Sequence, residues 1–315
     1  MALLPHLWQL YWETRRQRLQ EKGSKGLVVA VTNQLIKLLQ EQGHQPISIV
    51  TLGCGEGHIL SAIREANATT PLSLIGIDIQ ADVIAQAKQF YPDFQFLVAD
   101  YRDPVWRSQV GSVHLVLLVN SLHEVYSATR DPRTGFIAEQ EGKQQVRQTL
   151  AHIAAALEPD GYLVLFDGLE HDLPGSAPIT IQFCSDAAAN LFTKFAHEYQ
   201  AEPITFTRIL DQQITLPLRH FTRFITKTLF LETPLWAIER DESYQYFTER
   251  EFLETLIPLG LLIQEIQRLS PHLEQWQQWV TLLTSDVLFP DEHILLVGQK
   301  TTQKIYSKGY DYNHS

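Results

Sequence analysis

The chain contains very little cysteine and no long hydrophobic run. Only two of its 315 residues are cysteine, Cys54 and Cys184, and they lie far apart. This scarcity argues against a disulfide framework and favours a reducing compartment such as the cytoplasm. No apolar segment approaches the roughly 20 residues that a membrane-spanning helix needs. Residues 1–10 also lack the apolar core and cleavage site of a secretory signal. We therefore expect a cytoplasmic protein with no membrane partner.

Basic residues are also in short supply. The 25 lysines and arginines are outnumbered by 36 aspartates and glutamates, which gives a net charge of −11 at pH 7. Proteins that follow a nucleic-acid backbone need a broad basic surface, so this balance argues against nucleic acid as a partner. The length is sufficient for one large domain with an insertion, and no internal repeat is visible. A monomer and a homodimer both remain open.

Strand-like and helix-like segments alternate over the first half of the chain. Apolar segments typical of strands lie at 47–52, 73–78, 94–98, 113–119 and 162–167. Segments with helical periodicity lie at about 57–67, 81–90 and 140–157. Such alternation predicts parallel strands joined by helical crossovers, which is an α/β fold.

The alternation stops after Gly168. Residues 171–248 combine several prolines with many aromatics and threonines and show no regular strand–helix rhythm. We expect them to form an inserted subdomain. The earlier pattern then returns: Thr248 and Glu251 form a capping box for a helix at 249–258. Further elements are expected as a strand at 261–268, a helix at 272–284 and a strand at 293–299.

The first strand runs directly into a turn with three glycines. Gly53, Gly55 and Gly57 occupy every second position, and a helix is expected to begin near His58. Glycines at this spacing allow a tight turn and a close approach of the backbone to a ligand. The N–H groups of the following helix would face that ligand. A dinucleotide-binding fold would place a further glycine at position 58, so the histidine argues against a nicotinamide-dependent oxidoreductase.

The turn and the following strand ends resemble those of the class I S-adenosylmethionine (SAM)-dependent methyltransferases, over about 46–170 and 250–300. The resemblance implies a Rossmann-like fold with a seven-stranded, mostly parallel sheet, helices on both faces, and SAM as cofactor. It implies that Asp78 binds the ribose hydroxyls and that Asp100 binds the adenine amino group. The implied cofactor-binding residues are Gly53, Cys54, Gly55, Gly57, Asp78, Ile79, Asp100, Tyr101 and Asn120. Thr51 stands where the family commonly carries an acid that helps to hold the methionine ammonium group.

The resemblance also implies a domain organisation. Its parts are N-terminal helices over the cofactor site at 1–45, a cofactor-binding core at 46–170, an inserted substrate or lid subdomain at 171–248, the rest of the core sheet at 249–300, and a disordered tail at 301–315.

The fourth strand is followed by Leu122-His123-Glu124, which is similar to a segment of the plant-type small-molecule O-methyltransferases. The similarity implies that His123 is the general base for a hydroxyl acceptor and that the adjacent Glu124 assists catalysis by orienting the imidazole or raising its pKa. The alternative is a histidine that only packs beside the cofactor. The Asp/Asn-Pro-Pro-Tyr/Phe segment of many N-methyltransferases is absent. We therefore expect O-methylation of a small molecule. The alternatives are a methyltransferase that acts on RNA or protein, and a non-catalytic SAM-binding scaffold, which Thr51 favours.

Substrate contacts are expected from the N-terminal helix and the insertion. Tyr11 would close over the site or attach its helix to the core. Arg219, Arg223 and Lys227 recur every fourth residue, so on a helix they form one stripe. This stripe would receive an anionic group of the substrate, or else form a solvated helix face. No His/Cys cluster has zinc-like spacing, so no metal is predicted, although the carboxylates leave a catechol-type magnesium site open.

Overall fold

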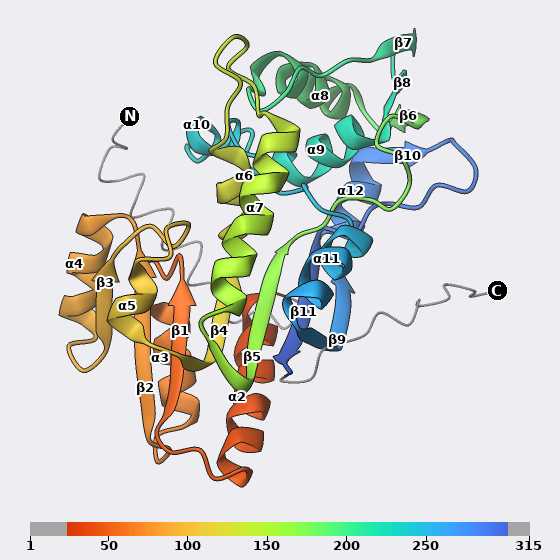
Figure 1. Ribbon diagram of the computed structural model, residues 1–315. Helices are drawn as coiled ribbons and strands as arrows, with labels where there is room; N and C mark the ends of the chain where they lie inside the picture. Colours follow the sequence, from red (N-terminus) through yellow and green to blue (C-terminus); the bar gives the residue numbers. More distant parts are fainter. Residues whose placement is uncertain (1–23, 302–315) are drawn as a thin grey trace.

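The central element of the fold is a seven-stranded sheet. The computed structural model describes residues 24–301 and is drawn in Figure 1. The strand order is β3-β2-β1-β4-β5-β11-β9. The strands are β1 Ile47–Leu52, β2 Leu72–Asp78, β3 Gln95–Val98, β4 Val113–Val119, β5 Leu157–Gly168, β9 Leu261–Leu269 and β11 His293–Lys300. Neighbours among β1 to β5 pair in parallel, whereas β11 is antiparallel to both β5 and β9. The predicted seven-stranded, mostly parallel sheet is confirmed.

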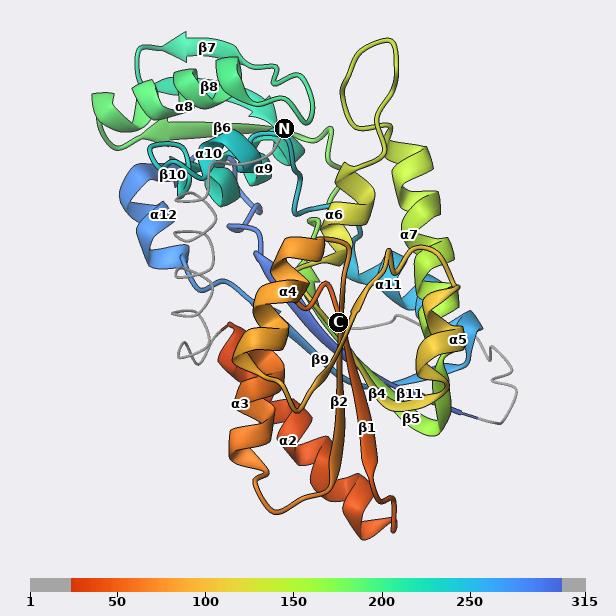
Figure 2. The same cartoon turned by 90° about the vertical axis from the view of Figure 1, so that its left-hand side faces the viewer.

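Helices cover both faces of this sheet. They are α2 Lys25–Glu41, α3 His58–Ala66, α4 Ala81–Phe90, α5 Trp106–Val110, α6 Leu122–Ser127, α7 Glu139–Ala154 and α11 Glu249–Leu256, which continues into the 3-10 turn Ile257–Leu259. Figure 2 shows α2, α3 and α4 on one face and α5, α7 and α11 on the other. The capping box predicted at Thr248 and Glu251 is present at the start of α11.

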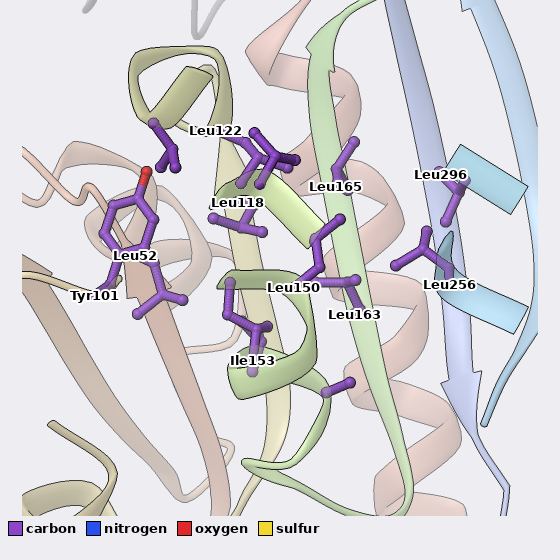
Figure 3. Packing of buried hydrophobic residues seen from close by; sticks show 14 of the residues in the cluster. Leu52, Tyr101, Leu118, Leu122, Leu150, Ile153, Leu163, Leu165, Leu256 and Leu296 are labelled. Carbon is purple, nitrogen blue, oxygen red and sulfur yellow. The ribbon is translucent and has the colours of Figure 1, made fainter. Parts of the chain in front are cut away.

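Alternating side chains of the central strands pack into two separate hydrophobic cores, one on each face of the sheet. In β1, Ile47 and Ile49 point toward α2 and α3, whereas Val50 and Leu52 belong to the core under α7 and α11. Figure 3 shows this second core, where leucines of β4 and β5 meet Leu150 of α7. Burying one such leucine side chain contributes about 2 kcal/mol to stability. Packing in the two cores fixes the positions of the carboxyl ends of the strands, where the functional site lies.

A second, four-stranded antiparallel sheet lies beyond the carboxyl ends of the central strands (Figure 1). Its order is β10-β6-β8-β7. The surrounding elements are β6 Pro178–Phe183, α8 Asp186–Glu198, β7 Thr207–Leu210, β8 Gln213–Pro217, α9 Leu218–Thr228, α10 Trp236–Glu239, α12 Leu273–Trp279 and β10 Val280–Leu282. The helix predicted over 272–284 is therefore wrong beyond Trp279. Val280 and Thr281 are β-branched, and this segment pairs with β6 rather than extending the helix.

The start of β5 also differs from the prediction. Pro159, Asp160 and Gly161 resemble a turn in the sequence, but the strand begins at Leu157 and runs through them. Asp160 adopts a left-handed φ of 62°, and the pairing with β4 shifts its register there. The segment is thus a bulge within a strand, which is a conformation that aspartate tolerates.

Two predicted features lie outside the described residues: the N-terminal helix that contains Tyr11, and the tail after Thr301. Within residues 24–301, no helix is long and apolar enough to cross a bilayer.

Candidate active site

The glycine turn after β1 has the left-handed backbone that its spacing predicts. The φ angles of Gly53, Gly55 and Gly57 are 67°, 54° and 83°. A Cβ atom on Gly53 would lie 2.6 Å from Cβ of Ser121, so a side chain there would collide with the residue after β4. Helix α3 begins immediately after Gly57. The turn therefore brings bare backbone and a helix N-terminus to the carboxyl edge of the sheet.

A pocket lies beside this turn, at the carboxyl ends of β1 to β4. Of the residues predicted for the site, it is lined by Gly53, Asp78, Ile79, Asp100, Tyr101, Asn120 and Glu124. Cys54, Gly55 and Gly57 shape the turn but are not part of this wall. Burial raises the pKa of the Cys54 thiol, as does the nearby charge of Asp78, so the thiol stays neutral. The sequence missed Gln80, Arg102, Val125 and Ala128, which complete the wall.

Asp78 is held in place by backbone donors at the end of β2. The amide of Gly55 donates to its Oδ2 at 2.9 Å, and the amide of Gln80 donates to its Oδ1 at 3.0 Å. Each carboxylate oxygen keeps a further lone pair directed to other donors. A carboxylate fixed in this way is suited to accept hydrogen bonds from two vicinal hydroxyls, such as those of a ribose.

We expect Asp78→Ala to weaken SAM binding by about 100-fold or more, because hydrogen bonds to a charged group contribute roughly 1.5–3 kcal/mol each. Equilibrium dialysis with labelled S-adenosylhomocysteine measures this loss. Asp82→Ala is the matched control, since Asp82 is exposed in the first turn of α4 and its replacement changes the charge equally. Equal affinities of the Asp78 and Asp82 variants for S-adenosylhomocysteine would show that Asp78 does not bind the cofactor.

Asp100 is already paired with an arginine that the sequence did not single out. Nε of Arg102 lies 2.9 Å from both carboxylate oxygens of Asp100, and the backbone amide of Arg102 also donates to Oδ1 at 2.9 Å. The side-chain hydrogen bond from Arg102 lowers the pKa of Asp100. The contact of Asp100 with adenine remains a prediction. Arg102 was missed because a lone arginine after a strand has no distinctive pattern.

Tyr101 and Asn120 both line the pocket. The Tyr101 hydroxyl donates to the carbonyl of Ser121 at 2.7 Å, and its ring packs with Leu52 in the core (Figure 3). Asn120 directly follows β4 and has a left-handed φ of 49°, and its backbone amide donates to the carbonyl of Phe166 at 2.7 Å. Asparagine tolerates this conformation better than most residues, and such conformations cluster at functional sites.

His123 forms a buried pair with Asp167. Its Nδ1 lies 2.7 Å from Oδ1 of Asp167, and the two side chains are 2% and 0% exposed. Asp167 also accepts the backbone amides of Leu122, His123 and Gly168, so the carboxylate is rigidly fixed. Asp167 thus orients the imidazole, a role that the sequence assigned to Glu124, whose side chain lines the cofactor pocket. The sequence missed this partner because it is 44 residues away, on the neighbouring strand.

The other ring nitrogen of His123 faces the segment that follows α10. Nε2 lies 3.8 Å from Oε2 of Glu242, beyond hydrogen-bond distance, and makes no hydrogen bond to a described residue. The ring of Tyr244 packs edge-on against the imidazole, with 4.6 Å between centroids. Burial alone would lower the pKa of His123, but the carboxylates of Asp167 and Glu242 outweigh it and raise the pKa to about 10. When the imidazole is neutral, His123 is therefore a strong base for a hydroxyl that reaches Nε2.

The cationic stripe on α9 is buried at two of its three residues. Arg223 is 1% exposed and Lys227 is 0% exposed, so the alternative of a solvated helix face is wrong for them, whereas the side chain of Arg219 is 27% exposed. Nη1 of Arg223 lies 2.6 Å from Glu170, and Arg219 pairs with Glu139 and Glu202 at 2.9 Å. Arg219 also lines a separate cavity, together with His220. The substrate role of Arg219 and Arg223 remains a prediction, since both charges are already neutralised by carboxylates.

The pocket residues fit an adenosyl cofactor. Gly53 lines the pocket without a side chain, and a Cβ there would collide with Ser121, while Asp78 adds a carboxylate to the pocket wall. The hydroxyl of Thr51 is buried and makes no hydrogen bond to a described residue, so it has capacity for a further partner. Among residues 24–301, no three His, Cys, Asp or Glu side chains gather in a way that would hold a metal ion.

The chain is similar to known methyltransferases. Residues 50–163 match a methyltransferase domain family. No curated protein matches the chain in sequence. The CurJ carbon methyltransferase has a TM-score of 0.48 at 15% identity, over 92% of this chain and 58% of that one. A SAM-dependent methyltransferase from Mesorhizobium loti has 0.43 at 15% identity, over 81% and 91%. A chain from the complex between the Haloferax volcanii Trm112 methyltransferase activator and the putative methyltransferase has 0.44 at 14% identity, over 95% and 100%.

The strand order of the sheet and the match over residues 50–163 show a SAM-dependent methyltransferase domain. Residues 50–163 include every residue that lines the pocket, and also His123, and SAM is the cofactor of this domain.

Proposed function

We propose that this methyltransferase methylates an oxygen atom of a small-molecule acceptor. The observation that carries the proposal is the His123–Asp167 pair, with 2.7 Å between Nδ1 and the carboxylate. A hydroxyl nucleophile must lose its proton as it attacks, and an imidazole oriented by a carboxylate is a typical base for that step. SAM supplies an electrophilic methyl group when bound. Asp78 would hold its ribose, and Nε2 of His123 would take the acceptor proton.

The position of His123 supports this role. It lies on α6 directly before Glu124 and Val125, which line the cofactor pocket, so the helix that forms part of the pocket wall also carries the imidazole. The segment after α10 covers its other side, because Ser243 and Ser127 exchange hydrogen bonds of 3.0 and 3.3 Å. We infer that residues 171–248 shape the acceptor pocket, while 46–170, 249–269 and 293–300 form the cofactor core; residues 273–282 join the second sheet instead. The acidic net charge favours a small acceptor over RNA.

The test is to incubate the protein with methyl-¹³C SAM and a metabolite extract that also contains RNA and protein. The three fractions are then separated, and the chemical shift of the labelled carbon reports the atom to which it is attached. We expect an oxygen-bound methyl group in the small-molecule fraction, and none with Asp78→Ala. A carbon- or nitrogen-bound methyl group, or label in RNA or protein, would overturn the proposal. No transfer at all, despite SAM binding, would favour a scaffold.

A further inference from the structure

A buried ion pair connects helices α9 and α10. Nζ of Lys227 on α9 lies 2.8 Å from Oε2 of Glu239 on α10, and the two side chains are 0% and 4% exposed. A buried lysine and glutamate retain their charges at low cost only when they are paired. This pair lies outside the cofactor pocket and makes no contribution to its wall.

The same ion pair holds the ring of Tyr244. The Tyr244 hydroxyl donates to Oε2 of Glu239, the oxygen that also accepts from Lys227. Nζ of Lys227 lies 3.6 Å from the centroid of the Tyr244 ring, which is a close cation–π contact. The tyrosine is therefore held both at its hydroxyl and over its ring face.

The backbone around Tyr244 is fixed against the central sheet. A Cβ atom on Gly168 would collide with the carbonyl of Tyr244, so only glycine allows this close approach. On the preceding residue, the amide of Ser243 donates to Oγ of Ser127 at 3.0 Å. Gly168 directly follows Asp167, so Tyr244 is attached to the same strand end that orients His123.

We propose that Tyr244 is a positioning residue for His123 and that the Lys227–Glu239 ion pair anchors it, a role that rests on the proposed function of His123. The Tyr244 ring lies 4.6 Å from the imidazole at an interplanar angle of 73°. The imidazole is hydrogen-bonded to Asp167 through Nδ1, and its Nε2 lies 3.8 Å from Glu242, so both polar contacts are made at ring nitrogens and a packing contact on the ring restricts its tilt further. Tyr244 provides that contact, and it links the orientation of the base to the helices of the inserted segment.

The matched pair of variants is Tyr244→Phe and Tyr246→Phe. Both remove one hydroxyl from the same segment, but the Tyr246 hydroxyl is buried and makes no hydrogen bond to a described residue. Its ring stacks on Tyr126 rather than on His123. Both variants keep every charge of the Lys227–Glu239 pair, so both are expected to fold.

The first readout needs no acceptor: the solvent exchange rate of the His123 Nδ1 proton, measured by NMR on the whole protein with S-adenosylhomocysteine. We expect Tyr244→Phe to accelerate exchange by about tenfold, because a loosened ring breaks its hydrogen bond to Asp167 more often. Tyr246→Phe should leave the rate unchanged. Equal rates in wild type and Tyr244→Phe would overturn the positioning role.

The second readout separates this inference from the proposed function. Rates of label transfer from methyl-¹³C SAM into the metabolite extract are compared for His123→Gln, Tyr244→Phe and the double variant. If Tyr244 acts through His123, its replacement lowers kcat by about tenfold in wild type and has no further effect in His123→Gln. Additive losses would overturn the positioning role and leave the base intact. A wild-type rate in His123→Gln would overturn the proposed base itself.

Discussion

His123→Gln is expected to lower kcat for methyl transfer by about 10²–10⁴-fold, the range that a general base contributes, and to leave the affinity for SAM unchanged. The glutamine is uncharged at every pH and cannot accept a proton from a hydroxyl. The cofactor pocket does not include the imidazole in its wall, so SAM binding should not change. Asp167→Asn should act in the same direction, because an amide no longer favours the tautomer that leaves Nε2 free to accept. Single-turnover rates with labelled SAM measure both effects.

His197→Gln is the control for this experiment. His197 is exposed on α8, so the same substitution there tests whether loss of any histidine matters. Thermal unfolding of each variant separates a catalytic loss from a folding defect. An unchanged kcat in His123→Gln would show that the histidine only packs beside the cofactor.

We expect kcat/KM to rise by about tenfold per pH unit from pH 7 until it levels off near pH 10. Only the neutral imidazole accepts a proton, and the carboxylates of Asp167 and Glu242 hold the pKa of His123 at about 10. An acceptor hydroxyl of similar acidity, such as a phenol with a pKa of about 10, exchanges a proton with this base at little cost. Glu242→Gln removes one of the two carboxylates and should move the plateau to lower pH. A flat profile would indicate an acceptor with no proton to lose, such as a carboxylate.

Stability should change with pH in the opposite sense to activity. The folded-state pKa of His123 is raised above its ordinary value of 6.5. Its ion pair with Asp167 therefore stabilises the fold fully below pH 6.5, and this contribution is lost as pH rises through 10. Activity at high pH is therefore best measured as an initial rate, immediately after the protein is transferred from neutral pH.

The parts of the site that the sequence predicts are those that depend on local backbone chemistry. Gly53 and Gly57 need left-handed φ angles, and glycine is the residue that supplies them at no steric cost. Asp78 ends β2. The two strands that pair with β2 in the sheet, β1 and β3, are also the strands that precede and follow it in the sequence. The nearly continuous apolar sequence of β4 predicts that the strand is buried on both faces. The prediction is confirmed, because its apolar residues are only 0–4% exposed.

The parts that the sequence misses depend on contacts between distant segments. Asp167 orients His123 only because β4 and β5 pair in parallel, with Val119 beside Phe166. Arg223 appears in the sequence as part of a stripe, and only the fold brings Glu170 and Glu202 to neutralise it. The second sheet was missed because its strands have only three to six residues, too few for a clear alternation.

The most direct test of this account is isothermal titration of the wild-type protein with SAM and with S-adenosylhomocysteine. The pocket beside Gly53, Asp78 and Asn120 predicts a single site with a dissociation constant in the micromolar range or below for both ligands. An absence of binding to either ligand by folded protein would contradict the account, because every later step depends on a filled cofactor pocket.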